Sequence, residues 1–172
     1  TVTATRPNET WLTDITYVPT GEGWLYVAEV KDLYTCEVVG YAMGARMTTD
    51  LVRDALRKAV GAKRPRPGVI HHSDRGSQYC AQDYQEQLRK FGMTASMSRK
   101  GNCYDNAPME SFWGTLKNEL VHHRRYATRE QARREITEYI ELFYNRQRRH
   151  SRLGNRSPAA FAQQWVRQQL AV

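Results

Sequence analysis

The sequence has little cysteine, and this scarcity excludes several kinds of site. Its 172 residues include three cysteines, Cys36, Cys80 and Cys103. They form no CxxC pair and show no metal-ligand spacing, which argues against a zinc-finger site and against a disulfide framework. An odd number of thiols fits a reducing compartment, so we expect a cytoplasmic protein.

Long apolar stretches are also missing. No run approaches the roughly 20 residues that a membrane-spanning helix needs, so no membrane partner is expected. The segment TVTATRPNETW at the start of the sequence has no apolar stretch typical of a signal peptide. The sequence contains no internal repeat, low-complexity segment or long linker, and its length suits one domain with a sizeable core.

Acidic residues are scarce in the second half of the chain, which makes that half strongly basic. Residues 1–86 carry 10 basic and 11 acidic side chains, a net charge of −1, whereas residues 87–172 carry 16 basic and 7 acidic ones, a net charge of +9. This asymmetry indicates a surface that binds a polyanion such as nucleic acid. A solvated, arginine-rich helical face would give the same count, so charge alone leaves both interpretations open.

The first half of the sequence reads mainly as strands. Residues 11–18, 24–32 and 36–43 are rich in β-branched and aromatic residues and are joined by short connections. This pattern predicts three antiparallel strands. A helix is expected from Thr48 or Thr49 to about Ala59, followed by the loop KRPRPG, which is rich in helix breakers.

The remaining sequence alternates strands and helices. Strands are predicted at 68–74 and 93–98, on either side of a helix at 81–91, and this order implies parallel pairing with a right-handed crossover. Later helices are predicted at about 106–120 and 128–144, with a last one beginning at Ser157-Pro158. The predicted fold class is α/β, a mixed five-stranded sheet of three antiparallel and then two parallel strands, flanked by helices. That order is characteristic of the ribonuclease H-like fold.

Three acidic residues stand in three different settings. Asp14 lies within a predicted strand, where aspartate is disfavoured and a buried carboxylate needs a partner. Asp74 ends a strand, at the edge where α/β folds place ligands. Glu110 follows on a helix, with 35 residues between it and Asp74. Each has a simpler alternative: an edge or turn aspartate for Asp14, a helix cap or Asx turn for Asp74, and a surface salt bridge for Glu110.

Taken together, the three carboxylates predict a site for hard divalent cations. Oxygen ligands suit Mg²⁺ or Mn²⁺ rather than zinc. Two such ions about 3.5–4 Å apart activate the attacking oxygen and stabilise the leaving oxygen in phosphoryl transfer. Lys117 shares one face of the predicted helix with Glu110 and Trp113, although simple solvation would also explain its position.

Longer motifs surround the acids and extend from Asn8 through Phe161, and among them are WLTDITYV, HHSDRGSQY, SRKGNCYDNAPMESFWGTLKNEL, YNRQRRHSRLG and SPAAF. In this combination the chain resembles the catalytic core of DDE transposases. More narrowly, it is similar to bacterial insertion-sequence transposases with an integrase-like core, within the retroviral integrase superfamily. The resemblance implies that Asp14, Asp74 and Glu110 bind the metal, Mg²⁺ or Mn²⁺, and that the protein cleaves DNA strands and transfers them.

The resemblance also implies DNA-binding residues. Lys117 is expected to face the DNA end, and Asn106, one helical turn before Glu110, to orient that acid or to contact DNA. His71 and His72 are expected to support the end of their strand. Four further candidates for DNA binding are Arg99, Lys100, Arg148 and His150. For the signature formed by Tyr144, Asn145, Arg148 and His150, packing against the sheet and phosphate binding both stay open.

The expected partners are DNA, as the terminal repeats of the element and as the target, and further copies of the same chain. Related transposases carry an upstream helix-turn-helix region, whereas this sequence starts almost at the first predicted strand. We therefore expect a single core domain over residues 1–172, with a helical extension at about 128–172 and without the N-terminal DNA-recognition region. The rival interpretations are a ribonuclease H-like nuclease and a transposase that has decayed to a DNA-binding protein.

Overall fold

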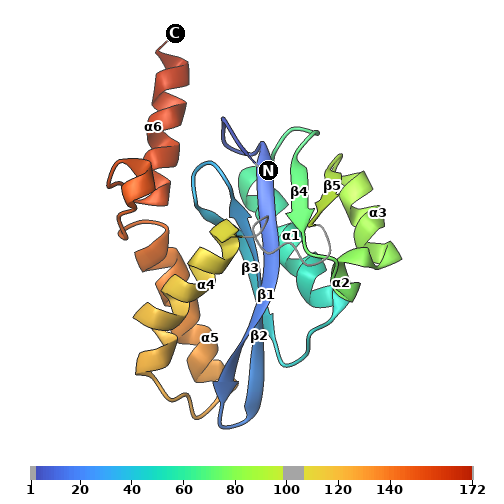
Figure 1. Cartoon of the computed structure of the whole chain (residues 1–172), viewed down its shortest axis with the longest axis vertical. Coiled ribbons are helices and arrows are strands. Elements are labelled where there is room, and N and C mark those ends of the chain that lie inside the picture. Colours follow the sequence, from blue (N-terminus) through green and yellow to red (C-terminus); the bar gives the residue numbers. More distant parts are fainter. Residues whose placement is uncertain (1–2, 99–106, 172) are drawn as a thin grey trace.

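Five strands form one sheet, and helices pack against both of its faces (Figure 1). The computed structural model describes residues 3–98 and 107–171, without the side chains of residues 107–111. The strands are β1 (Thr10–Thr20), β2 (Gly23–Asp32), β3 (Val38–Gly44), β4 (Ile70–Ser73) and β5 (Thr94–Met97). The α-helices are α1 (Thr49–Lys63), α2 (Ser77–Cys80), α3 (Gln82–Lys90), α4 (Ala107–Glu119), α5 (Arg129–Glu138) and α6 (Pro158–Leu170). Shorter or wider turns are η2 (Val121–His123), the π-helix η3 (Tyr139–Tyr144) and η4 (Ser151–Leu153).

The strand order is β3-β2-β1-β4-β5, which confirms the predicted mixed sheet. Strands β1, β2 and β3 pair antiparallel, whereas β4 pairs parallel with β1 and with β5. The central strand β1 therefore has an antiparallel neighbour on one side and a parallel neighbour on the other. Asp14 lies within β1, and Asp74, predicted as the last residue of a strand, directly follows the end of β4 at Ser73, so both belong to this β1–β4 boundary.

Side-chain alternation along β1 and β2 divides the core into two layers. Leu12 and Val27 pack with buried residues of α4, α5 and η3, whereas Trp11 and Ala28 pack with those of α1, α2 and α3. Successive residues of a strand point to opposite faces, which explains the division. Figure 1 shows the same arrangement, with α4 and α5 on one side of the sheet and α1, α2 and α3 on the other.

The C-terminal helical segment is bound to the edge strand β3 through two neighbouring side chains. The amide of Asn145 donates to the Val38 carbonyl at 3.0 Å and accepts from the Val38 N–H at 2.9 Å, so it takes the place of a further strand. The buried Tyr144 donates its hydroxyl to the Cys36 carbonyl at 3.0 Å. Packing against the sheet thus accounts for the first two residues of the signature that continues to Arg148 and His150.

The predicted elements are present, with differences in their bounds. Helix α1 runs beyond its predicted end at about Ala59, because Arg64 closes it in a left-handed conformation (φ 45°) and donates its N–H to the Val60 carbonyl. The short helix α2 is missing from the sequence-based prediction. The helix predicted over 128–144 is divided into α5 and the π-helix η3, a change in hydrogen-bond pattern that apolar periodicity does not reveal.

The described part of the chain bears on two expectations, one about membrane-spanning helices and one about the cysteines. Within it, none of the helices combines the length and the apolar character that crossing a bilayer requires. Cys36 is buried and Cys80 is exposed, and both are free thiols. Cys103 lies outside the described residues.

Candidate functional site

The parallel pairing of β1 with β4 brings Asp14 and Asp74 to one edge of the sheet. Leu12 and His72 are the last paired residues of the two strands, and each acid follows two residues later. Neighbouring strands lie about 4.8 Å apart, and residues two positions apart in a strand share a face. The register therefore brings both acids to the same edge of the sheet, with Asp14 on the face that Leu12 shares with α4 and Asp74 directly after the end of β4.

The charges of both acids act on the pKa of the Tyr79 hydroxyl. This buried side chain is hydrogen-bonded to Thr13 Oγ1 at 3.2 Å. Burial, followed by the neighbouring Tyr84, raises the pKa of Tyr79 well above its ordinary value, and the charges of Asp14 and Asp74 each raise it further. Asp14 and Asp74 thus lie within electrostatic range of the same side chain, as the strand register requires.

Local hydrogen bonds orient the two carboxylates. Asp14 Oδ1 accepts from the Ile15 N–H at 2.8 Å, and Asp74 Oδ1 accepts from the Gly76 N–H at 2.7 Å. The bond at Asp74 has the i to i+2 geometry of an Asx turn, the alternative considered for this residue. A turn that uses one carboxylate oxygen is compatible with a ligand role for the other. A Cβ at Gly76 would lie 2.9 Å from Asp74 Oδ1, so any side chain there would displace the carboxylate.

Helix α4 is attached to Asp14 through Trp113. The indole N–H donates to Asp14 Oδ2 at 3.3 Å, and the ring is buried. Glu110 precedes Trp113 by three residues in α4, and positions three apart lie on the same side of a helix. The side chain of Glu110 itself lies outside the described residues. The backbone of α4 therefore carries the third predicted acid on the same helix face as the residue that contacts Asp14.

The donor set at this edge suits a hard divalent cation. Asp14 and Asp74 supply carboxylate oxygens only, and oxygen ligands are those that Mg²⁺ and Mn²⁺ prefer. Among the described side chains, no group of three histidine, cysteine or acidic residues gathers in a metal-binding arrangement. The two aspartates are therefore the part of the predicted triad that the described residues bring together.

Glu29 is a further acid near Asp14 and is not among the predicted site residues. It lies directly opposite Asp14 in the β1–β2 pairing and is fully buried. Both of its carboxylate oxygens have no hydrogen-bond partner among the described residues. Burial raises its pKa well above the ordinary value, Lys31 opposes the rise, and Asp14 adds to it. Glu29 and Lys31 lie on the same face of β2 as Leu25 and Val27. The sequence signal for a buried charged pair was this change from apolar to charged residues along one face of the strand.

His71 and His72 form hydrogen bonds within the protein. His71 Nε2 lies 2.5 Å from the Tyr84 hydroxyl, whereas His72 Nδ1 lies 2.9 Å from Ser96 Oγ and its Nε2 lies 3.3 Å from Ser98 Oγ. Both rings are buried. These bonds connect the end of β4 to α3 and to the β5 edge, which is the supporting role expected for the two histidines.

We expect His71 to make the protein less stable in mild acid. Burial lowers its pKa to about 4 from an ordinary value of 6.5, so the unfolded chain binds a proton at a higher pH than the folded protein does. The stability associated with neutral His71 is complete above about pH 6.5 and is lost as the pH falls towards 4. Between pH 7 and pH 5 the loss amounts to roughly 2 kcal/mol.

Urea unfolding at these two pH values measures the effect. His71→Gln should lose roughly 2 kcal/mol less than the natural protein between pH 7 and pH 5, whatever its stability at pH 7. Equal losses in the two proteins would show that His71 does not titrate with a lowered pKa.

The predicted DNA-binding residues lie at two places. The Lys117 ammonium lies 5.6 Å from the centre of the exposed Tyr17 ring. Arg148 Nε lies 2.8 Å from Glu119 Oε1, and the His150 ring packs edge-on against Tyr144 with 5.1 Å between ring centres. The three remaining candidates, Arg99, Lys100 and Asn106, lie outside the described residues.

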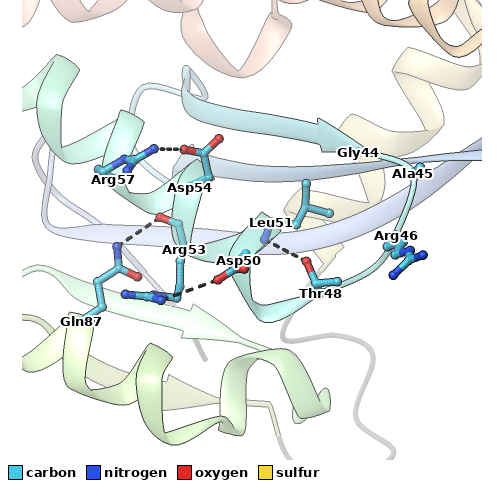
Figure 2. Close-up of a pocket in the computed structure, with 10 residues that line it drawn as sticks. All are labelled: Gly44, Ala45, Arg46, Thr48, Asp50, Leu51, Arg53, Asp54, Arg57 and Gln87. Carbon is cyan, nitrogen blue, oxygen red and sulfur yellow. Dashed lines mark hydrogen bonds and ion pairs between the residues drawn. The ribbon is translucent and has the colours of Figure 1, made fainter.

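A cavity of about 700 Å³ at the start of α1 is separate from this site (Figure 2). Two of its arginines form ion pairs within α1, Arg53 with Asp50 and Arg57 with Asp54, and Arg46 also lines the cavity. Figure 2 also shows the Gln87 amide against the Arg53 carbonyl. Since α1 packs on the opposite face of the sheet from α4, this cavity is not part of the acidic site.

Two sequence models of protein families match the chain, and both are described as "Integrase core domain". One matches residues 4–103 and the other matches residues 91–158. Asp14 and Asp74 lie within the first match, and Glu110 lies within the second.

Curated proteins with similar sequences come from bacterial insertion sequences. The chain is 62% identical over 165 residues to the insertion element IS600 uncharacterized 31 kDa protein of Shigella sonnei, a match of 96% of this chain and 61% of that protein. It is 51% identical over 158 residues to the transposase for insertion sequence element IS904 of Lactococcus lactis, over 92% of the chain and 62% of the relative. It is also 51% identical over 159 residues to transposase InsF for insertion sequence IS3A of Escherichia coli, over 92% and 55%. The chain thus spans about 55–62% of the length of these relatives.

Solved structures of similar shape include the catalytic core domain of a viral integrase. The HTLV-2 integrase catalytic core domain in complex with magnesium matches 91% of this chain and 97% of its own, with a TM-score of 0.68 and 14% identity. A chain from the structure of the simian T-cell lymphotropic virus intasome in complex with PP2A regulatory subunit B56 gamma matches 80% of this chain over 50% of its own length, with a TM-score of 0.65 and 17% identity. At these identities the likeness concerns the fold, which is the ribonuclease H-like fold expected from the strand order.

Proposed function

We propose, from the premise that this chain belongs to the integrase core domain family, that it is the catalytic core of an insertion-sequence transposase that cleaves DNA strands and transfers them. One observation carries the proposal. Asp14 and Asp74 occupy matching positions at the boundary of β1 and β4, beside a helix that bears Glu110 and is attached to Asp14 through Trp113. The transposase relatives support the same assignment.

In this proposal, the carboxylates of Asp14, Asp74 and Glu110 hold two Mg²⁺ or Mn²⁺ ions. When bound, such ions act as Lewis acids that activate an attacking oxygen and stabilise a leaving one. The protein groups orient the carboxylates, with the Trp113 indole N–H on Asp14 and the Gly76 N–H on Asp74. Fixed donors of this kind keep ligand oxygens in place, as outer partners do in metal sites generally.

The basic residues near the acids have a separate task in the proposal. Lys117 follows Trp113 by one turn of α4 and reaches the Tyr17 ring. From there its ammonium would neutralise charge on a DNA phosphate in the transition state. Asn106 immediately precedes α4, and Arg99 and Lys100 lie in the segment that leads to it. We propose that all three contact the same DNA end.

The partners and the assembly follow from the same premise. We propose that the substrate is DNA, both the ends of the element and the target, and that several copies of the protein act together. The structural relatives from HTLV-2 occur in dimeric and trimeric forms. We also propose that residues 1–172 act as one core domain, with the helices from about residue 128 as an extension that Asn145 and Tyr144 fasten to β3.

Substrate choice separates this proposal from the ribonuclease H-like nuclease that shares its fold and ligand set. The full-length protein should be incubated with Mg²⁺ and either a DNA duplex carrying an end of its element or an RNA–DNA hybrid of the same sequence. We expect nicking at the element end and joining of the new 3′ end to a second duplex, with the hybrid left intact. Cleavage of the hybrid together with an intact DNA end would contradict the proposal.

A further inference from the structure

A basic cavity lies beside the acidic site and has no role in the function proposed above. It has a volume of about 500 Å³ and is formed by the end of β2, helix α4 and the segment from Tyr144 to Asn155. Four cationic side chains line it, and no carboxylate is found among its described lining residues. These cations are Lys31, Arg148, Arg149 and Arg152.

The ammonium of Lys31 is the least exposed of these charges. The residue is 5% exposed, and burial lowers its pKa, while Cys36 and Glu29 oppose this effect and Arg152 and Arg148 add to it. Four cationic side chains around one cavity, with no carboxylate among its described lining residues, favour an anionic ligand.

His150 also lines the cavity. Its Nε2 is buried and has no hydrogen-bond partner among the described residues, and buried polar atoms of this kind are uncommon in folded proteins. Burial, followed by Arg148 and Lys31, lowers the pKa of His150 to about 4. At neutral pH the ring is uncharged, and in the tautomer protonated at Nε2 it donates one hydrogen bond without adding a charge.

The positions of these groups are fixed by bonds to the rest of the fold. Arg148 donates from Nε to the two carboxylate oxygens of Glu119 at 2.8 and 3.1 Å. Arg152 donates from Nη2 to the Leu33 carbonyl at 3.1 Å. The His150 backbone N–H donates to the Arg156 carbonyl, and its own carbonyl accepts from the Asn155 N–H at 2.9 Å. Groups held in advance lose little entropy when a ligand binds.

The cavity is also close to the proposed metal ligands. Lys31 pairs with Leu12 across the β1–β2 ladder, and Leu12 is two residues from Asp14 on the same strand and face. Two residues of a strand span roughly 7 Å. A polyanion that reaches Asp14 therefore has another of its charged groups within reach of the cavity.

We propose that this cavity binds a phosphate group through Lys31, Arg148, Arg152 and the Nε2 of His150, with Arg149 at its rim. Arginine forks and lysine are the side chains that proteins use to bind phosphate. The identification of that phosphate as part of a DNA backbone rests on the proposed function, whereas free inorganic phosphate has the same chemistry. In the signature formed by Tyr144, Asn145, Arg148 and His150, the first two residues pack against the sheet. The last two thereby have a role in ligand binding.

Histidine-ring ¹⁵N resonances of the chain, recorded in EDTA at pH 7, test the site directly. His150→Gln identifies the His150 signals. Inorganic phosphate is titrated in one arm and a short DNA duplex in the other. We expect both to shift His150 Nε2 while the signals of His71 and His72 stay unchanged. A shift with inorganic phosphate alone would assign the site to free phosphate, and no shift in either arm would overturn the proposal.

Two exposed arginines provide a matched comparison. Arg149 lines the cavity, whereas Arg146 on the same segment does not. Arg149→Gln should weaken phosphate binding several-fold. It should also reduce the slope of log affinity against log salt concentration for duplex DNA by about 0.9. Lys31→Met should weaken phosphate binding roughly tenfold. Arg146→Gln should leave phosphate binding unchanged, and an equal loss in Arg146→Gln and Arg149→Gln would contradict a defined site.

The test is independent of the metal chemistry. EDTA removes divalent ions, and Asp14→Asn should bind inorganic phosphate as the natural protein does. Failure of strand cleavage would therefore leave the result for the cavity intact. Circular dichroism melting of Lys31→Met shows whether that variant is folded, and Arg149→Gln changes only an exposed side chain.

Discussion

Replacing Asp74 by asparagine is expected to reduce metal-dependent DNA strand cleavage by a factor on the order of 10³ or more, a loss typical of removing an electrostatic stabiliser from an active site. The amide carbonyl of asparagine can still accept the Gly76 N–H that Asp74 Oδ1 accepts at 2.7 Å, so the local turn is retained. The substitution instead removes the negative charge that a divalent cation requires of its ligand. Asp14→Asn and Glu110→Gln should cause comparable losses.

Single-turnover cleavage of an element-end duplex by the full-length protein measures this effect. Asp83→Asn is the matched control, because Asp83 is an exposed residue in the first turn of α3 and the charge change is the same. Activity should survive in Asp83→Asn and vanish in Asp74→Asn. Normal cleavage by Asp74→Asn would remove Asp74 from the site.

Gly40→Ala is expected to destabilise the protein by about 3 kcal/mol, at the upper end of overpacking effects. Gly40 lies in β3 beneath α1, where an added Cβ would lie 2.5 Å from the Ala55 carbonyl oxygen and 2.6 Å from the Ala59 nitrogen. Both atoms belong to helix backbone and cannot rotate away. The helix must therefore move off the sheet, which opens contacts along its buried face of Leu51, Val52, Ala55, Leu56 and Ala59.

Gly61→Ala provides the control for the glycine substitution. Gly61 lies near the end of α1, and a Cβ there would have no atom within 4 Å. Alanine should stabilise the helix by about 0.5–1 kcal/mol. Urea unfolding of both variants measures the difference, and a Gly40→Ala protein as stable as the natural one would show that β3 and α1 are not in close contact.

The sheet could be predicted from the sequence because its signals are local. Segments rich in β-branched and aromatic residues and joined by short connections predict the three antiparallel strands, and strand–helix–strand order predicts the parallel pair. The same reasoning placed Asp14 within a strand and Asp74 at a strand end, and the β1–β4 register brings both to one edge of the sheet. The Asx turn at Asp74 was foreseen as an alternative, and it coexists with a carboxylate oxygen that the turn does not use.

Other features depend on contacts between distant segments, which periodicity cannot reveal. The burial of Glu29 opposite Asp14 depends on α4 and η3 covering that face of the sheet. The two bonds of Asn145 to Val38 join residues 107 positions apart. The basic cavity likewise needs Lys31 of β2 to meet the loop around His150, so the sequence left packing and phosphate binding as alternatives for that signature.

The measurement that tests the central claim most directly is anomalous scattering from crystals soaked in MnCl₂. We predict Mn²⁺ at the boundary of β1 and β4, coordinated by carboxylate oxygens of Asp14 and Asp74 at about 2.2 Å, with the same peak lost in Asp74→Asn. Mn²⁺ bound elsewhere while both carboxylates stay in their present hydrogen bonds, or an undiminished peak in Asp74→Asn, would contradict the metal-dependent transposase core proposed for this chain.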